Sequence, residues 1–315
     1  MKTSFPKIFA LGTKYISDIF SSEVEVTEKV DGSQFGFGKI DGQLYLRSKG
    51  EEVYIDNCPK MFKLAVEYVA SIQNRLPNDL IFYCEYLSKP KHNTLNYGRV
   101  PKNNLILFGV CDKELRFKEN LQEYADLLDI EVVPILFKGK VESVDNVYKL
   151  IERESILGNT QVEGIVVKNY SKEVMCGGQV IPIATGKYVS EKFKEIHGAT
   201  WNKENKTGNR IEFYFQSLKT EARWQKAVQH LEEKGLLTKS PKDIGILMKE
   251  ANQDIVIEEK ENIKEFLWGE YKGEISRIAT RGLPEWYKKK LMEEGTEFAP
   301  LNVEELTPVK TKEIK

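Results

Sequence analysis

A lysine between a strand-like segment and a glycine-containing turn is the first candidate for chemistry in this sequence. It is Lys29, within residues 27–34, which read TEKVDGSQ. Val24 and Val26 alternate with polar residues before it, so Lys29 is expected at the end of a half-buried strand, beside a core. Desolvation or a nearby cation lowers the pKa of a lysine from about 10.4 and makes its amine reactive. We therefore predict that Lys29 is a covalent nucleophile.

The same residue types are also common in ordinary turns. Lys, Asp and Gly are frequent near a type I′ hairpin, and Lys-x-Asp-Gly alone is a weak motif. In this interpretation Lys29 is exposed, and Asp31 and Gly32 only turn the chain back toward a second strand at residues 35–40. The rest of the chain must decide between the two interpretations.

Other candidate residues follow in chain order, most of them at the ends of predicted strands. They are Arg47, Lys49, Glu85, Phe108, Asp112, Glu163, Lys168 and Lys187. Each has an ordinary alternative: Phe108 could belong to the core, and Arg47 and Lys49 could form a solvated turn. The loop at residues 88–102, basic and containing Tyr97, could bind phosphates or simply be exposed.

In this order and spacing, the candidate residues resemble the six motifs of the covalent nucleotidyltransferases, which include DNA ligases, RNA ligases and mRNA capping enzymes. Three features are similar to ATP-dependent RNA ligases like the second RNA ligase of T-even bacteriophages. Glu28 directly precedes the motif lysine, the C-terminal part is predicted to be helical, and residues 186–195, GKYVSEKFKE, look like their final motif. Joint matches are far more specific than Lys-x-Asp-Gly alone.

The resemblance implies an enzyme that seals 5′-phosphate and 3′-hydroxyl RNA ends through lysyl-AMP and adenylylated-RNA intermediates, with ATP and Mg²⁺ (or Mn²⁺) as cofactors. Lys29, Lys168 and Lys187 would be catalytic. The cofactor-binding residues it implies are Glu28 at the adenine pocket, Phe108 stacked on the base, Arg47 and Glu85 at the ribose, Lys29, Lys168 and Lys187 at the phosphate, and Glu163 at the metal.

The chemistry explains why these residue types are needed. Attack on the α-phosphate adds negative charge near an anionic group, so cations and a metal are required around it. Lys168 and Lys187 would supply the cations and are predicted to lower the pKa of Lys29 by like-charge repulsion. Glu163 would hold Mg²⁺, which prefers carboxylate and phosphate oxygens.

Two positions depart from the pattern of the phage-type enzymes. Gln34 stands where they usually have asparagine, and Val189 replaces the second of two lysines in the last motif. Lys192 would compensate for the missing lysine, and we expect substitution of Lys187 to impair adenylylation more than substitution of Lys192.

Composition indicates a globular protein inside the cell. The 315 residues are 41% hydrophobic and 30% charged, with a net charge of −1. No run of 18 apolar residues or signal peptide is evident, so we expect a cytoplasmic monomer without a membrane partner. The spacing of the four cysteines predicts reduced thiols, and the three histidines are too far apart in sequence to suggest a metal cluster.

Periodicity predicts an α+β protein with two domains. Residues 1–200 would form a nucleotidyltransferase domain of antiparallel sheets with flanking helices, and residues 201–315 an all-helical domain that positions RNA. The boundary is expected near residues 198–208, which are polar and rich in turn formers. Arg277, Arg281 and residues 288–290 are candidate phosphate contacts, although a lysine run is more often a solvated helix face.

Three other functions remain open from the sequence. A capping guanylyltransferase would use GTP, but no C-terminal OB-fold is evident. DNA ligases typically have an arginine shortly after Lys-x-Asp-Gly, where this chain has Ser33, Gln34 and Phe35. A nucleic-acid-binding protein on a degenerate ligase scaffold would be expected to lack some of the motif lysines and carboxylates, which are all present.

Overall fold

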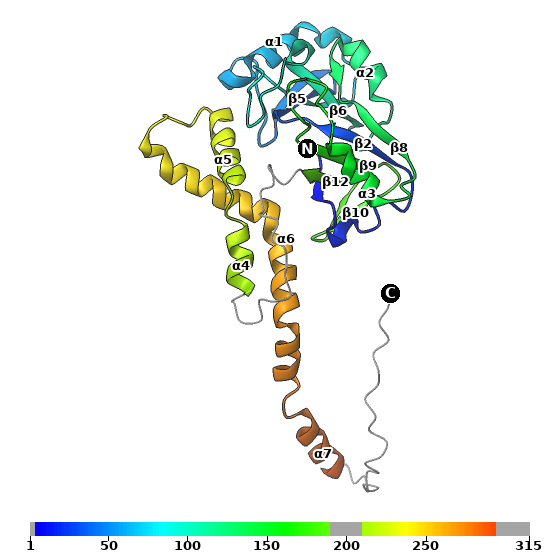
Figure 1. Cartoon of the computed structure of the whole chain (residues 1–315), viewed down its shortest axis with the longest axis vertical. Coiled ribbons are helices and arrows are strands. Elements are labelled where there is room, and N and C mark those ends of the chain that lie inside the picture. The colour runs from blue at the N-terminus through cyan, green and yellow to red at the C-terminus, as the bar shows by residue number, and fades with distance from the viewer. Residues whose placement is uncertain (1–3, 190–209, 294–315) are drawn as a thin grey trace. The chain divides into compact units, whose positions relative to one another are not determined.

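The computed structural model describes residues 4–189 and 210–293 (Figure 1). Internal contacts divide the chain into two units, Met1–Glu259 and Lys260–Lys315. The domain boundary expected at residues 198–208 lies outside the described residues, so the division at residues 200 and 201 stays a prediction. All the strands belong to the first unit, and helix α6 (Ile244–Ala279) runs from the first unit into the second.

The first sheet contains the strand that ends in Lys29. Its strand order is β1-β12-β9-β2-β8, with β1 parallel to β12 and the other pairs antiparallel. The strands are β1 (Phe9–Ala10), β2 (Val24–Lys29), β8 (Ile135–Gly139), β9 (Gly164–Asn169) and β12 (Ala184–Val189). Val26, Ile165 and Val167 pack into a core on one face of this sheet, with Ile16 and Ile19.

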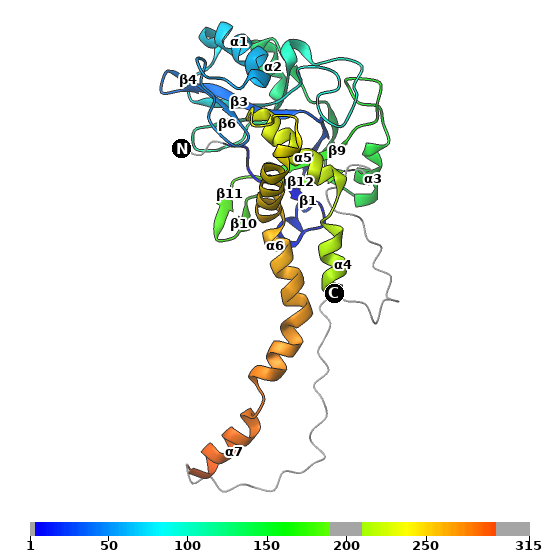
Figure 2. The ribbon, with the colours of Figure 1, turned by 90° about the vertical axis from the view of Figure 1, so that its left-hand side faces the viewer.

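The second sheet has the order β4-β3-β5-β6-β7. Its strands are β3 (Ser33–Ile40), β4 (Gln43–Ser48), β5 (Leu80–Tyr86), β6 (Leu105–Asp112) and β7 (Glu131–Val132). Helices α1 (Lys63–Ser71) and α2 (Leu121–Leu128) cover its outer face, and Val66, Val69 and Leu128 pack there against Phe35 and Phe37 (Figures 1 and 2).

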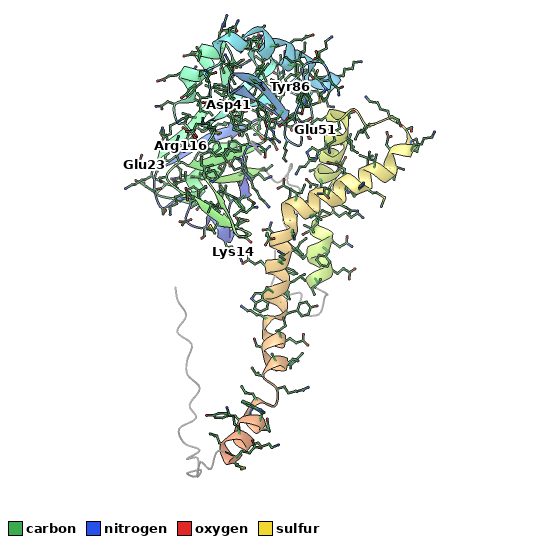
Figure 3. All side chains as sticks on the ribbon, turned by 180° about the vertical axis from the view of Figure 1, so that it is seen from behind. Lys14, Glu23, Asp41, Glu51, Tyr86 and Arg116 are labelled. Carbon is green, nitrogen blue, oxygen red and sulfur yellow. The ribbon has the colours of Figure 1, made fainter. Side chains whose placement is uncertain are left out.

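The chain crosses from one sheet to the other directly after Lys29. Strand β2 pairs with β8 and β9, whereas β3 pairs with β4 and β5. The alternative interpretation, in which a type I′ hairpin follows Lys29, is therefore wrong. Asp31 and Gly32 do not return the chain onto β2. Asp41 and Gly42 form the hairpin turn between β3 and β4, since Ile40 pairs with Gln43 and the two turn residues have φ of 48° and 79° (Asp41 is labelled in Figure 3).

The chain crosses between the sheets a second time after β7. Pro134 separates β7 in the second sheet from β8 in the first, because proline has no N–H to continue a ladder. Strand β11 (Gln179–Ile181) pairs with β10 (Val174–Cys176), and β12 is the strand that pairs with β9.

Helices follow residue 209, as predicted, so the α+β class is confirmed. They are α4 (Arg210–Ser217), α5 (Glu221–Glu233), α6 and α7 (Leu283–Glu293), with the short α3 (Val144–Tyr148) earlier in the chain. Ser240 caps the start of the α6 segment in a capping box with Asp243, and Pro241 follows at the first position. All four cysteines are free thiols. In the described parts of the chain, no helix combines the length and the apolar character needed to cross a membrane.

Candidate active site

Three of the predicted lysines project from the same face of the first sheet. Alternate residues of a strand share a face, and so do residues directly paired across strands. The paired rows are Lys29 with Gly164, Glu25 with Lys168 and Thr185, and Thr27 with Val166 and Lys187. Lys29, Lys168 and Lys187 therefore lie on the face opposite to the Val26 core.

Lys29 forms an ion pair with Glu163, the residue directly before β9. The distance from Lys29 Nζ to Glu163 Oε2 is 2.6 Å, and the two side chains are 27% and 13% exposed. Burial lowers the pKa of Lys29, but the carboxylates of Glu163, Glu85 and Asp31 outweigh it and raise that pKa overall. The predicted lowering of the Lys29 pKa by neighbouring lysines is therefore wrong for this structure, because the charges that face the amine are negative.

The carboxylates around Lys29 are themselves perturbed. Burial raises the pKa of Glu85 to about 8, against the opposing effect of Lys29 and with a further rise from Glu163 and Asp31. Burial also raises the pKa of Glu163, although Lys29 opposes this. Like charges held close together in a partly dehydrated site cannot all ionise readily, so this cluster is poised to take up or release a proton.

Lys168 is buried at the other end of the β2–β9 ladder. Its Nζ donates to the carbonyl of Phe108 at 2.7 Å and lies 3.6 Å from Glu25 Oε1. Burial lowers the pKa of Lys168 more than Glu25 raises it. Since Phe108 belongs to β6, this lysine connects the inner face of the first sheet to the second sheet.

The loop at residues 88–102 holds the turn that follows Lys29. Asp31 Oδ2 accepts hydrogen bonds from the backbone N–H groups of Thr94 and Leu95, each at 2.9 Å. The Asp31 N–H donates to the hydroxyl of the buried Tyr97 at 2.7 Å. These residues of the loop thus support the turn, a role that the prediction of phosphate binding did not include.

Glycine is required at position 32 because strand β5 comes close to its Cα, and not because the backbone is left-handed. A Cβ at this position would lie 2.7 Å from the carbonyl oxygen of Tyr86 and 2.8 Å from Glu85 Cγ. The Gly32 N–H donates to Glu85 Oε1 at 3.0 Å, and its carbonyl accepts from Asn93 Nδ2 at 2.7 Å. Glu85, predicted to contact the ribose, therefore fixes the turn after Lys29 in this structure.

Glu28 points away from the amine of Lys29, on the other face of β2. It accepts hydrogen bonds from Ser155 Oγ at 2.5 Å and from the Ile156 N–H at 3.0 Å. Burial raises its pKa, although both hydrogen bonds oppose the rise. The structure thus connects Glu28 to the segment before β9, and its predicted place at the adenine pocket remains a prediction.

Phe108 and Arg47 make contacts within their own surroundings. The ring of Phe108 lies edge-on to Phe5, with centroids 5.1 Å apart, and near Tyr83. Arg47 is buried, and its Nε donates to the Ser48 carbonyl at 2.9 Å. Their predicted contacts with the base and the ribose remain predictions.

One further candidate can be placed, and one cannot. Asp112 pairs with Arg116 at 2.8 Å and accepts from backbone N–H groups in the turn after β6, which is a structural role. His92 is a packing residue, since it bonds Ser33 Oγ at 2.9 Å and burial lowers its pKa to about 4. Lys192 lies outside the described residues.

Glu163 is the carboxylate best suited to hold a metal beside Lys29. In the part of the chain that the structure describes, no three His, Cys, Asp or Glu side chains form a metal-binding group. Asp31 and Glu85 already accept backbone N–H groups. A Mg²⁺ ion usually takes one or two protein carboxylates and completes its shell with phosphate oxygens and water, so a single glutamate fits that ion.

Sequence reasoning missed several residues of this site. Glu25 is four residues before Lys29 on the same strand, so alternation alone could have placed it on the face of Lys29 and Lys168. Gln229 and Glu233 of α5 also contact the Lys29 turn. No signal in the sequence connects them to a turn about 200 residues earlier.

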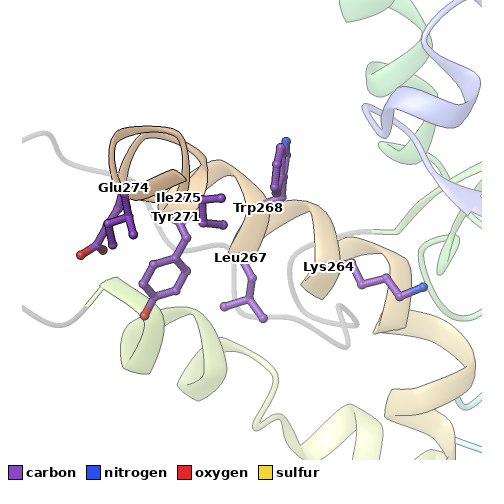
Figure 4. Close-up of a pocket in the computed structure, with 7 residues that line it drawn as sticks. Lys264, Leu267, Trp268, Tyr271, Glu274 and Ile275 are labelled. Carbon is purple, nitrogen blue, oxygen red and sulfur yellow. The ribbon is translucent and has the colours of Figure 1, made fainter. Parts of the chain in front are cut away.

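An apolar groove in the second unit lies apart from the predicted site residues in sequence. It is lined mainly by Leu267, Trp268, Tyr271, Ile275 and Ile278 of α6 (Figure 4). None of the lysines or carboxylates predicted for the site lines it. The groove therefore adds nothing to the chemistry at Lys29.

The N-terminal part of this chain is similar to RNA ligases. The family model for RNA ligase matches residues 22–189. No curated protein matches the sequence. The fold is similar to Naegleria gruberi RNA ligase with PPi, at 16% identity over 60% of this chain and 56% of that chain, with a TM-score of 0.45. A mutant of that ligase with ATP and Mn has 17% identity over 60% of this chain and 57% of the other, with a TM-score of 0.43. The match spans little more than half the length of these ligases.

Proposed function

Because the family model spans more than half of its residues, this chain belongs to the RNA ligase family, and we propose that it is an ATP-dependent RNA ligase with Lys29 as its nucleophile. The observation that carries the proposal is the arrangement around Lys29. Its amine lies 2.6 Å from Glu163 Oε2, on the sheet face that also carries Lys168 and Lys187. These are the cations and the carboxylate that phosphoryl transfer to an amine requires.

In the first step, Lys29 Nζ attacks the α-phosphorus of ATP. The N–P bond forms, the bond to the bridging oxygen breaks, and pyrophosphate leaves, giving lysyl-AMP. The amine must first lose a proton, because nearby carboxylates raise the pKa of Lys29. Lys29 Nζ donates to Glu163 Oε2 in this structure, and we propose that water takes the proton, so that Glu163 stays a carboxylate. Anything that draws the Glu163 carboxylate away from Lys29 also removes the largest effect that raises this pKa.

Glu163 would hold a Mg²⁺ or Mn²⁺ ion together with phosphate oxygens. Such an ion supplies charge neutralisation for the departing pyrophosphate. Lys187 would support the α-phosphate, and the buried Lys168 would hold the inner sheet face in place through the Phe108 carbonyl. Glu28, Phe108, Arg47 and Glu85 keep the base and ribose roles that the motif resemblance implies.

In the later steps, AMP passes to an RNA 5′-phosphate, and a 3′-hydroxyl displaces it to seal the strand. The helical residues 201–315 would position the RNA, as predicted from the sequence. The proposal also includes the predicted cytoplasmic location and monomeric state. The order of the motifs around Lys29 supports an RNA ligase over a capping guanylyltransferase or a DNA ligase.

Transfer of label from [α-³²P]ATP to the protein tests this proposal. We expect labelling by ATP and not by GTP, loss of labelling in Lys29→Ala, and normal labelling in the control Lys91→Ala, which removes an exposed loop lysine. Labelled enzyme should then seal RNA with a 5′-phosphate and a 3′-hydroxyl, offered as a nicked duplex, a bridged break or free single strands. Persistent labelling of Lys29→Ala would refute the assignment.

A further inference from the structure

The turn after Lys29 contacts not only the loop at residues 88–102 but also helix α5. Gln229 Nε2 donates to the Gly32 carbonyl at 3.0 Å and lies 3.2 Å from Ser33 Oγ. Ser33 Oγ donates to the carboxylate of Glu233, one helical turn after Gln229. The two α5 side chains also bond each other, with Gln229 Nε2 2.9 Å from Glu233 Oε1. Helix α5 therefore presents one connected pair of polar side chains to this turn.

These contacts are well protected from water. Ser33 is 1% exposed and Glu233 is 8% exposed. A buried carboxylate is costly unless it is hydrogen-bonded, so the contacts with Ser33 and Gln229 stabilise Glu233 at this place. With Glu85 and Asn93, the peptide groups of Gly32 are held from β5, from the loop and from α5.

Helix α5 is itself fixed within the first unit. Its Arg223 is 1% exposed, donates to Asp254 Oδ2 at 2.5 Å and donates to Glu259 Oε1 at 3.1 Å, both on α6. The Nζ of Lys7, near the start of the chain, donates to the carbonyl of Glu258 at 3.1 Å. The support for the Lys29 turn therefore continues from α5 into α6 and back to the N-terminal segment.

From this geometry we propose that Gln229 and Glu233 are positioning residues for the formation of lysyl-AMP, so that the helical region takes part in the first step and not only in RNA binding. The inference rests on the proposed function. Both side chains act through Gly32 and Ser33, which follow the nucleophile by three and four residues. A displacement of about 1 Å at a nucleophile can lower a rate by about 100-fold, so loss of this support should slow the attack of Lys29.

The test is single-turnover label transfer from [α-³²P]ATP to the full-length chain at a series of ATP concentrations. We expect Gln229→Leu/Glu233→Leu to lower the maximal rate constant by about 10-fold or more, with the half-saturating ATP concentration changed less than about threefold. Glu233→Gln keeps an oxygen acceptor for Ser33 and should stay within about threefold of wild type. Matched controls are Gln225→Leu and Glu232→Leu, which alter exposed residues of the same helix.

A merely structural role predicts a different result. It would lower the melting temperature and the fraction of protein that becomes labelled, and leave the rate constant of the folded fraction unchanged, which would overturn the inference. If the double variant does not fold, the test uses Ser33→Ala, which removes the hydroxyl that donates to Glu233. An unchanged rate constant for Ser33→Ala also overturns the inference. If the wild-type protein shows no labelling that depends on Lys29, the proposed function fails. If the wild type is labelled at Lys29 and the α5 variants are labelled at the same rate, the inference fails and the proposed function stands.

Discussion

Two Lys–Glu pairs lie at the two ends of the β2–β9 ladder, on one face of the sheet, and their environments differ. At one end Lys29 of β2 meets Glu163 at 2.6 Å, and both side chains are partly exposed. At the other end Lys168 of β9 meets Glu25 of β2 at 3.6 Å, and the two are 2% and 3% exposed. Carboxylates raise the pKa of Lys29, whereas burial lowers the pKa of Lys168.

In the proposed mechanism, Lys29 and Glu163 form a reactive pair, and Lys168 and Glu25 form a supporting pair. Lys29 lies at the strand end beside three carboxylates, where a change in one partner alters the protonation of the amine. Lys168 is almost fully buried, and its ammonium is held by a carbonyl of the opposite sheet. The same residue types across the same two strands thus give different properties, because burial and the number of neighbouring charges differ between the two ends of the ladder.

Removal of the buried lysine should have the largest effect on stability. Lys168→Met leaves Glu25 buried without its lysine partner, so we expect the free energy of unfolding to fall by about 3 kcal/mol, and labelling by ATP to fall about 100-fold or more. Lys29→Met should abolish labelling yet change the free energy of unfolding by less than about 1 kcal/mol, because its pair is partly exposed. Urea denaturation and label transfer measure both quantities.

A second substitution controls for the charge left behind. Lys168→Met/Glu25→Leu removes both charges and should recover more than half of the lost free energy of unfolding, without recovering labelling. If the single and double variants are equally destabilised, the pair is not the source of the effect.

Substitution of Glu163 should change the pH dependence of labelling. In the wild type, the fraction of free Lys29 amine rises about tenfold for each pH unit below its pKa, so the labelling rate should increase through pH 9. Glu163→Gln removes the carboxylate that raises the Lys29 pKa most, so the rate should level off at a pH lower by on the order of one unit. The rate itself should fall about 100-fold, because the proposed metal ligand is lost.

Single-turnover labelling from pH 6 to the highest pH at which the protein stays folded makes this measurement. Lys29→Ala supplies the background, and the exposed-loop variant Lys91→Ala supplies the control. If the rise for Glu163→Gln continues to as high a pH as the rise for wild type, Glu163 does not set the protonation of Lys29.

The raised pKa of Glu85 predicts a moderate change of the free energy of unfolding with pH. Its pKa is about 8 in the folded protein and ordinarily 4.5, so between these pH values the unfolded chain loses this proton while the folded chain keeps it. The free energy of unfolding that depends on Glu85 therefore falls as the pH rises from about 4.5 to about 8. Glu85→Gln should be close to wild type at pH 5 and more stable than wild type by about 2 kcal/mol at pH 8. Denaturant titrations at the two pH values compare them; an equal difference at both would refute the shift.

Much of the fold could be predicted because its local signals agree. Valines alternating before Lys29, the Asp41–Gly42 turn and the Ser240–Pro241 cap each specify structure over a few residues. The pairing of strands could not be predicted in the same way. The strands that flank Lys29 look like a hairpin in sequence, yet they belong to different sheets, because β2 pairs with the distant strands β8 and β9, whereas β3 pairs with β4 and β5.

The candidate site was predicted in its composition and not in its electrostatics. The motif lysines and Glu163 were identified by type and spacing, and the structure brings Lys29 and Glu163 into contact. The pKa of Lys29 is raised most by Glu163 and further by Glu85 and Asp31, whose distance from the amine is set by β5 and by the turn. The contribution of α5 depends on tertiary packing alone, so no local pattern could reveal it.

The smallest expected effect comes from the exposed partner of Glu25. Lys138 Nζ lies 4.0 Å from Glu25 Oε2 and its side chain is 43% exposed, whereas Lys168 is almost fully buried. Lys138→Met should change the free energy of unfolding by less than about 0.5 kcal/mol, because exposed ion pairs are screened by water and salt. Urea denaturation at low and high salt compares Lys138→Met with Lys168→Met. A loss for Lys138→Met as large as that for Lys168→Met would mean that Glu25 is stabilised from the surface, and burial would no longer distinguish the two ends of the ladder.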